Sequence, residues 1–128
     1  MDANLNRVNE GLRVCEDILR FLYDDRMLTA RLKKLRHQLT NRILEFPKPY
    51  RALVAARDVA CDVGKKSAVS VKRKPEWKDI FLANMKRSEE GLRVFEEVSK
   101  KLAPRQSRHF QSLRFELYDL EQRALKKF

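Results

Sequence analysis

The stretch "ANLNRVNEGLRVCED" at residues 3–17 returns as "ANMKRSEEGLRVFEE" at residues 83–97. Nine of the fifteen positions are identical, at a constant offset of 80. Packing alone explains the repeated leucine and valine, but it does not explain the repeated asparagine, arginine and glycine. The repeat is therefore the feature from which both the fold and a functional site can be predicted.

Apolar residues around the first copy follow the period of a helix. Between Leu5 and Leu22 the steps from one apolar residue to the next alternate between three and four, which is typical of an amphipathic helix. Asp24 and Asp25 break this pattern and can cap a second helix, whose apolar positions run from residue 28 to residue 43. Pro47 disfavours any continuation of that helix.

The second copy begins the same plan again. A helix is predicted from about Asp79, and Pro104 suits the first turn of the helix that follows. The second helix of one hairpin also resembles the second helix of the other weakly. The residues Leu35, Arg36 and Leu39 recur as Leu113, Arg114 and Leu117, at an offset of 78. We therefore predict an all-α fold in which two pseudo-repeated antiparallel helix hairpins, residues 2–45 and 79–127, form a four-helix bundle with a pseudo-twofold axis. Residues 1–128 are expected to be one domain.

The connector between the hairpins, residues 46–78, is too long for a simple loop in a compact domain. Its start, "YRALVAARDVACDVG", is apolar enough to be partly ordered. Its end, "KKSAVSVKRKPEWK", holds six basic residues and one acidic residue, and we expect it to be mobile.

The net charge of +11, from 29 Lys and Arg against 18 Asp and Glu, favours anionic partners such as nucleic acid, anionic lipid or phosphorylated metabolites. No apolar run approaches the roughly 18 residues of a membrane span, and nothing at the N-terminus resembles a signal peptide. Cys15 and Cys61 fit neither a disulfide framework nor a zinc site, and both lie in apolar surroundings. These features predict a cytoplasmic protein with buried free thiols.

The repeated polar residues are candidates for ligand contact. Asn4, Arg7 and Gly11 are spaced so that they share one strip of the helix, and Asn84 and Arg87 occupy the same strip in the second copy. Glycine inside a helix costs about 1 kcal/mol relative to alanine, so its recurrence indicates that a partner helix or a ligand comes close to the backbone. A structural role for the Asn and Arg residues is the alternative.

Arg13 and Arg93 form a second strip with acidic neighbours. They are candidates for phosphate contacts, and ordinary ion pairs on the helix surface are the alternative.

The connector contains "RDVACD", which supplies Arg57, Asp58 and Asp62. Paired carboxylates in a basic protein suit a magnesium ion that carries phosphates; a helix cap with a surface ion pair is the alternative. The nearby "GKKS" lacks the preceding strand and glycine of a P-loop. His37 and His109 have no arrangement with serine or cysteine that would support nucleophilic catalysis.

Three blocks, "DANLNRVNEGLRVCEDILRF", "RDVACDVG" and "ANMKRSEEGLRVFEE", resemble in their order and spacing the small monofunctional hydroxymethylpyrimidine-phosphate kinases of thiamine biosynthesis. The same domain occurs at the N-terminus of some thiamine-phosphate synthases. The resemblance extends from Asp2 to about Lys100 and implies the free-standing form. Val59 and Lys65 stand where the family usually has threonine, so any role of those hydroxyls must fall to another group.

The resemblance implies transfer of the terminal phosphoryl group of ATP onto hydroxymethylpyrimidine phosphate, with Mg²⁺ as cofactor. It assigns the catalytic positions to Arg57, Asp58 and Asp62, with the two aspartates as metal ligands. Phosphate binding would fall to Lys65 and to the repeated residues Asn4, Arg7, Arg13, Asn84, Arg87 and Arg93.

Two other functions compete with the kinase. The charge and the basic end of the connector also suit a basic helical nucleic-acid-binding protein, although aromatic residues are few outside the apolar stripes and the repeats are rich in acidic residues. A structural dimer or scaffold would use Gly11 and Gly91 only as helix-crossing points. The oligomeric state stays open, since a groove between subunits is as available as one between the two halves.

Overall fold

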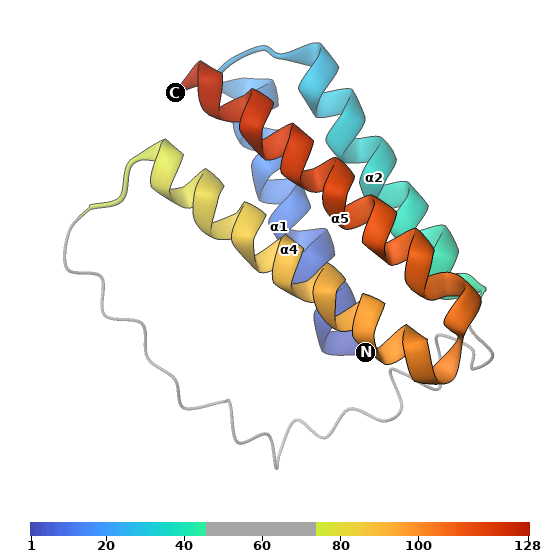
Figure 1. Ribbon diagram of the computed structural model, residues 1–128. Helices are drawn as coiled ribbons and strands as arrows, with labels where there is room; N and C mark the ends of the chain where they lie inside the picture. Colours follow the sequence, from blue (N-terminus) through green and yellow to red (C-terminus); the bar gives the residue numbers. More distant parts are fainter. Residues whose placement is uncertain (46–73) are drawn as a thin grey trace.

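The computed structural model describes residues 1–45 and 74–128, which form a bundle of four helices (Figure 1). The hairpin turns lie at opposite ends of the bundle, as a pseudo-twofold requires. The predicted all-α fold is confirmed, whereas the predicted order and mobility of the connector concern residues that lie mostly outside the described ranges. The elements are α1 (Asp2–Phe21), α2 (Arg26–Leu44), α4 (Trp77–Leu102), α5 (Pro104–Ala124) and the short 3-10 helix η2 (Leu125–Lys127).

The helices pack in a ring, in which α1 contacts α2 and α4, and α5 contacts α4 and α2. Leu22 belongs to the predicted apolar stripe but is exposed, because it follows the end of α1. Leu102, the last residue of α4, is exposed as well. The core consists of Leu5, Val8, Leu12, Cys15, Ile18, Leu19, Leu28, Leu32, Leu35, Leu39, Ile43, Phe81, Met85, Leu92, Phe95, Phe110, Leu113, Leu117, Leu120 and Ala124.

Local signals in the sequence set the helix ends. The Asp25 carboxylate accepts a hydrogen bond from the Leu28 amide at 2.9 Å, which confirms it as the cap of α2. Pro104 occupies the first turn of α5, as predicted. The helix α4 begins at Trp77, slightly before the predicted Asp79, because Glu76 and Asp79 form a reciprocal capping box.

The repeated glycines are the points at which α1 and α4 cross. A Cβ atom on Gly11 would lie 2.7 Å from the backbone oxygen of Asn84 and would collide with the Ser88 hydroxyl. A Cβ atom on Gly91 would collide with a Val8 methyl group and lie 3.3 Å from the backbone oxygen of Asn4. The residues that face the two glycines are themselves related by the offset of 80, so the crossing follows the pseudo-twofold.

In each hairpin, a repeated glutamate forms an ion pair with an arginine of the other helix. Glu16 of α1 accepts from Arg36 of α2 at 3.4 Å, and Glu96 of α4 accepts from Nε and Nη2 of Arg114 of α5, both at 2.9 Å. The glutamates are related by the offset of 80 and the arginines by the offset of 78. The weak resemblance between α2 and α5 therefore reflects an equivalent ion pair in each hairpin, Arg36 with Glu16 and Arg114 with Glu96.

Cys15 is fully buried and its thiol donates to the backbone oxygen of Phe81 at 3.5 Å. Burial raises the pKa of this thiol, so it stays protonated and serves as a core residue. The expected buried free thiol is confirmed for Cys15, while Cys61 lies outside the described residues.

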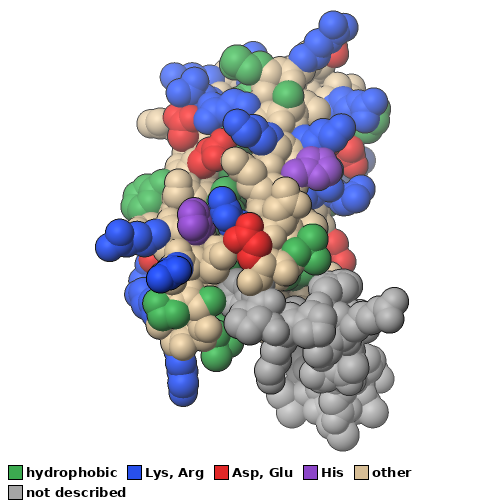
Figure 2. Space-filling model, turned by 90° about the vertical axis from the view of Figure 1, so that its right-hand side faces the viewer, with side chains coloured by type: hydrophobic (Ala, Val, Ile, Leu, Met, Phe, Trp, Pro, Cys, Tyr) green, Lys and Arg blue, Asp and Glu red, His purple; other side chains and the backbone are tan. Residues whose placement is uncertain are grey.

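Charged side chains of both signs are spread over the face seen in Figure 2 rather than gathered in one basic stripe. Of the helices in residues 1–45 and 74–128, none is long and apolar enough to cross a bilayer.

Replacing Gly11 with alanine should lower the free energy of unfolding by about 2 kcal/mol, because the new methyl group meets a backbone oxygen that cannot move aside. Gly91→Ala should cost less at the backbone, since the facing oxygen of Asn4 lies at 3.3 Å, but its new methyl group still collides with the fully buried Val8. Chemical denaturation measures both losses. The control is Arg13→Ala, an exposed position of the same helix; equal stability of Gly11→Ala and the control would contradict the close crossing.

The buried carboxyl group of Glu89 makes the free energy of unfolding depend on pH. Burial and then the neighbouring Glu121 raise the pKa of Glu89 to about 7, while Lys86, with Nζ 3.8 Å from Oε2, opposes this rise. The folded chain therefore keeps a proton that the unfolded chain releases near its ordinary pKa of 4.5. Since the folded state binds more protons in this interval, the free energy of unfolding falls as pH rises from about 4.5 through 7.

Glu89→Gln removes this acid and should raise the free energy of unfolding at pH 8 by about 1–2 kcal/mol, with a smaller gain at pH 5. Denaturant titrations of both proteins at the two pH values measure the difference. Glu10→Gln, a change at an exposed carboxylate of α1, serves as the control. Parallel pH profiles of Glu89→Gln and the unchanged chain would show that Glu89 ionises normally.

Candidate functional site

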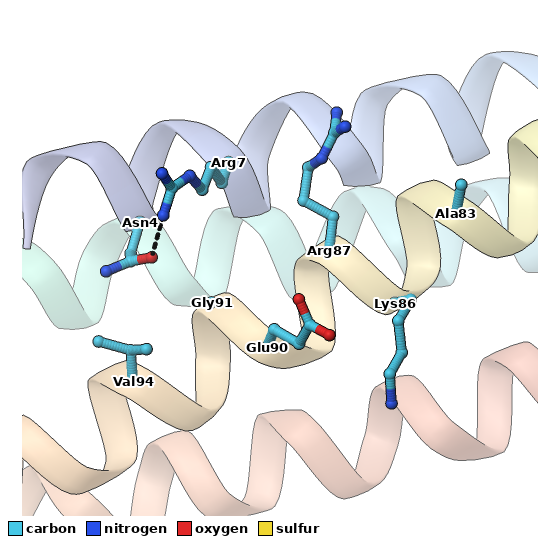
Figure 3. A pocket seen from close by; sticks show the side chains of 8 residues that line it. All are labelled: Asn4, Arg7, Ala83, Lys86, Arg87, Glu90, Gly91 and Val94. Atoms are coloured by element: carbon cyan, nitrogen blue, oxygen red, sulfur yellow. Dashed lines mark hydrogen bonds between the residues drawn. The ribbon is translucent and has the colours of Figure 1, made fainter. Parts of the chain in front are cut away.

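A cavity of about 480 Å³ opens where α1 and α4 cross (Figure 3). This volume lies within the range of about 300–1,000 Å³ that is usual for small-molecule sites. Because the crossing brings the repeated strips together, the cavity draws residues from both copies. The residues that line it are Asn4, Arg7, Ala83, Lys86, Arg87, Glu90, Gly91 and Val94.

Arg7 and Arg87 occupy the same position in the two copies, and both line this one cavity. Each lies between the two residues of its helix that mark the close crossing, namely Asn4 and Gly11 in α1 and their equivalents in α4. The two arginines therefore lie on either side of the pseudo-twofold axis. The close approach of α1 and α4 at the two glycines fixes the separation of the helix positions that carry Arg7 and Arg87.

Arg7 is also oriented by its own helix. Its Nη1 donates to the side-chain oxygen of Asn4 at 3.2 Å, as the dashed line in Figure 3 shows. Arg87 makes no ion pair or hydrogen bond with the rest of residues 1–45 and 74–128, and its guanidinium extends toward α1 in the same view. Both arginine side chains are exposed, so their donors are available to a bound anion.

The charge of the cavity is positive. Three of the lining side chains are cations, and Glu90 is the single carboxylate among them. Lys86 bends toward α5 in Figure 3 and its Nζ lies 3.8 Å from Glu89, which leaves Arg7 and Arg87 as the free cations of this cavity among the described residues. Oxyanions such as phosphates are the ligands that such paired guanidinium groups prefer.

Three predicted residues lie in the described helices but not in the cavity lining. Asn84 donates to the backbone oxygen of Ile80 at 2.8 Å, one turn back in its own helix. Arg93 pairs with Glu96 at 3.0 Å and with Glu97 at 2.8 Å, which is the surface ion pairing foreseen as its alternative role. Arg13 is exposed beyond the cavity and makes no ion pair within the described part of the chain.

The predicted connector residues Arg57, Asp58, Asp62 and Lys65 lie outside the described residues, so their roles stay predictions. Within residues 1–45 and 74–128, no group of three or more His, Cys, Asp or Glu side chains is arranged to hold a metal ion. In the described part of the cavity wall, Glu90 alone offers a carboxylate. A magnesium ion at this site would therefore need ligands from the connector or from a bound phosphate chain.

Sequence reasoning missed Ala83, Lys86, Glu90 and Val94 as lining residues. Glu90 was noted only as a neighbour in an ion-pairing strip, although its identity with Glu10 marked it as repeated. Ala83 and Val94 are also identical in the two copies, but alanine and valine are ordinary packing residues. Lys86 carried no such signal, since asparagine stands at the equivalent position of the first copy.

The fold and the cavity define a class: a pseudo-repeated helical bundle with a cationic cavity where its two repeated helices cross. The model of the ThiD2 family matches residues 1–123, so the chain belongs to this family.

The proteins to which the chain is similar include thiamine-phosphate synthases. The chain is 39% identical over 125 residues to the one from Synechococcus sp. (strain CC9311), which covers 98% of this chain and 34% of that protein. It is 37% identical over 122 residues to the one from Synechocystis sp. (strain ATCC 27184 / PCC 6803 / Kazusa), covering 94% of this chain and 34% of the relative. The chain thus spans about a third of the length of the curated relatives it matches. No solved structure matches it significantly.

Proposed function

We propose that this chain is an ATP-dependent kinase of thiamine biosynthesis that phosphorylates hydroxymethylpyrimidine phosphate to the diphosphate. The observation that carries the proposal is the placement of Arg7 and Arg87 in one cavity, on either side of the pseudo-twofold axis. Membership of the ThiD2 family and similarity to thiamine-phosphate synthases support the pathway.

The proposed reaction needs positioning more than acid–base chemistry. An oxygen of the acceptor phosphate attacks the γ-phosphorus of ATP, a new P–O bond forms, and the bond to the β–γ bridging oxygen breaks to release ADP. The attacking oxygen is already ionised at neutral pH, so no general base is required. The difficulty is to hold two polyanions together, and cations that neutralise the transferring group address it directly.

Arg7 and Asn4 would bind one phosphate group, and Arg87, on the opposite side of the axis, would bind the other. Their guanidinium groups donate several hydrogen bonds each, and the Asn4 amide holds Arg7 in place through the 3.2 Å contact. Because α1 and α4 cannot slide apart without losing the packing at Gly11 and Gly91, the two phosphates would be held at a fixed separation.

The connector would complete the site. In the proposal, Arg57 and Lys65 contact the β- and γ-phosphates, and Asp58 and Asp62 hold Mg²⁺. Bound there, the ion supplies charge neutralisation to the phosphate oxygens of ATP.

The acceptor's own phosphate would set the specificity. An arginine left without an anion in a closed site loses its hydrogen-bond partners, so the unphosphorylated alcohol should be a poor substrate.

Arg7→Gln and Arg87→Gln should each lower kcat/KM by about a hundredfold or more, since each removes a charged contact to a transferring or accepting phosphate. The melting temperature should hardly change because both side chains are exposed. The assay follows the diphosphate by mass after incubation with ATP, Mg²⁺ and hydroxymethylpyrimidine phosphate, with free hydroxymethylpyrimidine as the substrate control.

Arg105→Gln, an exposed arginine in the first turn of α5, is the matched control and should keep full activity. Unchanged rates in Arg7→Gln and Arg87→Gln would remove both residues from the site. Absence of product from the unchanged chain, together with salt-dependent RNA binding, would replace the kinase with the nucleic-acid-binding alternative.

A further inference from the structure

A second cationic cavity lies within the first hairpin. It has a volume of about 390 Å³ and is formed by the second half of α1 and the first half of α2. Arg20, Arg26 and Lys33 line it, and none of them forms an ion pair within residues 1–45 and 74–128. The helix α2 carries six arginines and lysines and no aspartate or glutamate, so it supplies no anion of its own to neutralise them.

The carboxylates that line this cavity do not cancel its charge. Glu16 is already held by Arg36 of α2 at 3.4 Å. Asp24 is therefore the single unpaired carboxylate against three cations in the described wall. Asp25, the next residue, points its carboxylate at the Leu28 amide and caps α2, so the N-terminus of that helix is already satisfied and the site does not depend on it.

A hydroxyl group without a partner marks the same cavity. Thr29 lines it, and its Oγ1 is shielded from solvent and has no hydrogen-bond partner among the described residues. The equivalent residue of the second hairpin, Ser107, donates to the backbone oxygen of Glu96 at 3.1 Å. The second hairpin thus satisfies this hydroxyl internally and the first does not. A buried hydroxyl without a partner is costly. Because threonine in a helix adopts either of two χ1 rotamers, the hydroxyl can turn toward the cavity and donate to an oxyanion bound there.

We propose that this cavity is a binding site for the phosphate group of a small molecule, held by Arg20, Arg26, Lys33 and the Thr29 hydroxyl. Arg7 and Arg20 are thirteen residues apart on α1, which corresponds to about 20 Å along the helix. That separation is too long for a phosphoryl group to pass between the two cavities. The site is therefore distinct from the proposed transfer site and goes beyond the kinase proposal.

The test is a titration of the ¹⁵N-labelled chain with pyrophosphate, and separately with ATP, followed by amide chemical shifts at constant ionic strength. We expect saturable shifts at Thr29 and Lys33 in both titrations. Equal affinities would identify the phosphate chain alone as the recognised group, and tighter binding of ATP would identify a nucleotide.

Arg26→Gln and Lys33→Gln should each weaken binding at this cavity about tenfold, since each removes one charge-assisted hydrogen bond. Thr29→Val keeps the shape of the side chain and should also weaken it. Lys34→Gln, the exposed neighbour that does not line the cavity, is the control and should bind normally. An equal loss in Lys34→Gln and Lys33→Gln, or shifts confined to the cavity of Arg7 and Arg87, would overturn the proposal.

Discussion

The close approach of α1 and α4 at Gly11 and Gly91 is the constraint on which the rest of the structure depends. A single added methyl group on Gly11 would meet the backbone of the other helix, so the two helices are in direct backbone contact there. This contact relates the two hairpins by a pseudo-twofold axis, because the residues that face the two glycines are equivalent. It also places two side chains from distant parts of the sequence, Arg7 and Arg87, in one cavity. The close crossing of α1 and α4 therefore determines both the arrangement of the hairpins and the position of the cavity.

Much of the fold could be predicted, because helix spacing and caps are local properties of the chain. The alternating steps of three and four predicted the buried stripes, and the capping residue Asp25 was placed correctly. The start of α4 was missed slightly, because the capping box of Glu76 and Asp79 was not recognised in a strongly basic stretch. The repeat also indicated the pseudo-twofold, since equivalent residues had to face equivalent surroundings. What it left open was whether a helix or a ligand approaches the glycines.

The site was less predictable, because a repeated residue can serve packing, ion pairing or binding with the same spacing. Asn4, Arg7 and Arg87 line the cavity, but Asn84 turns back to its own helix. Arg93 is neutralised by two glutamates. Glu96 was repeated for yet another reason, its ion pair with Arg114 between α4 and α5. These outcomes depend on which neighbour lies across each helix, and that information is tertiary.

The most direct measurement of the central claim is a crystal structure of the chain with a non-hydrolysable ATP analogue, Mg²⁺ and hydroxymethylpyrimidine phosphate. The account predicts phosphate oxygens within hydrogen-bonding distance of both Arg7 and Arg87, with one compound on each side of the pseudo-twofold axis. Both compounds bound away from the α1–α4 crossing, with the two arginines still facing solvent, would contradict it.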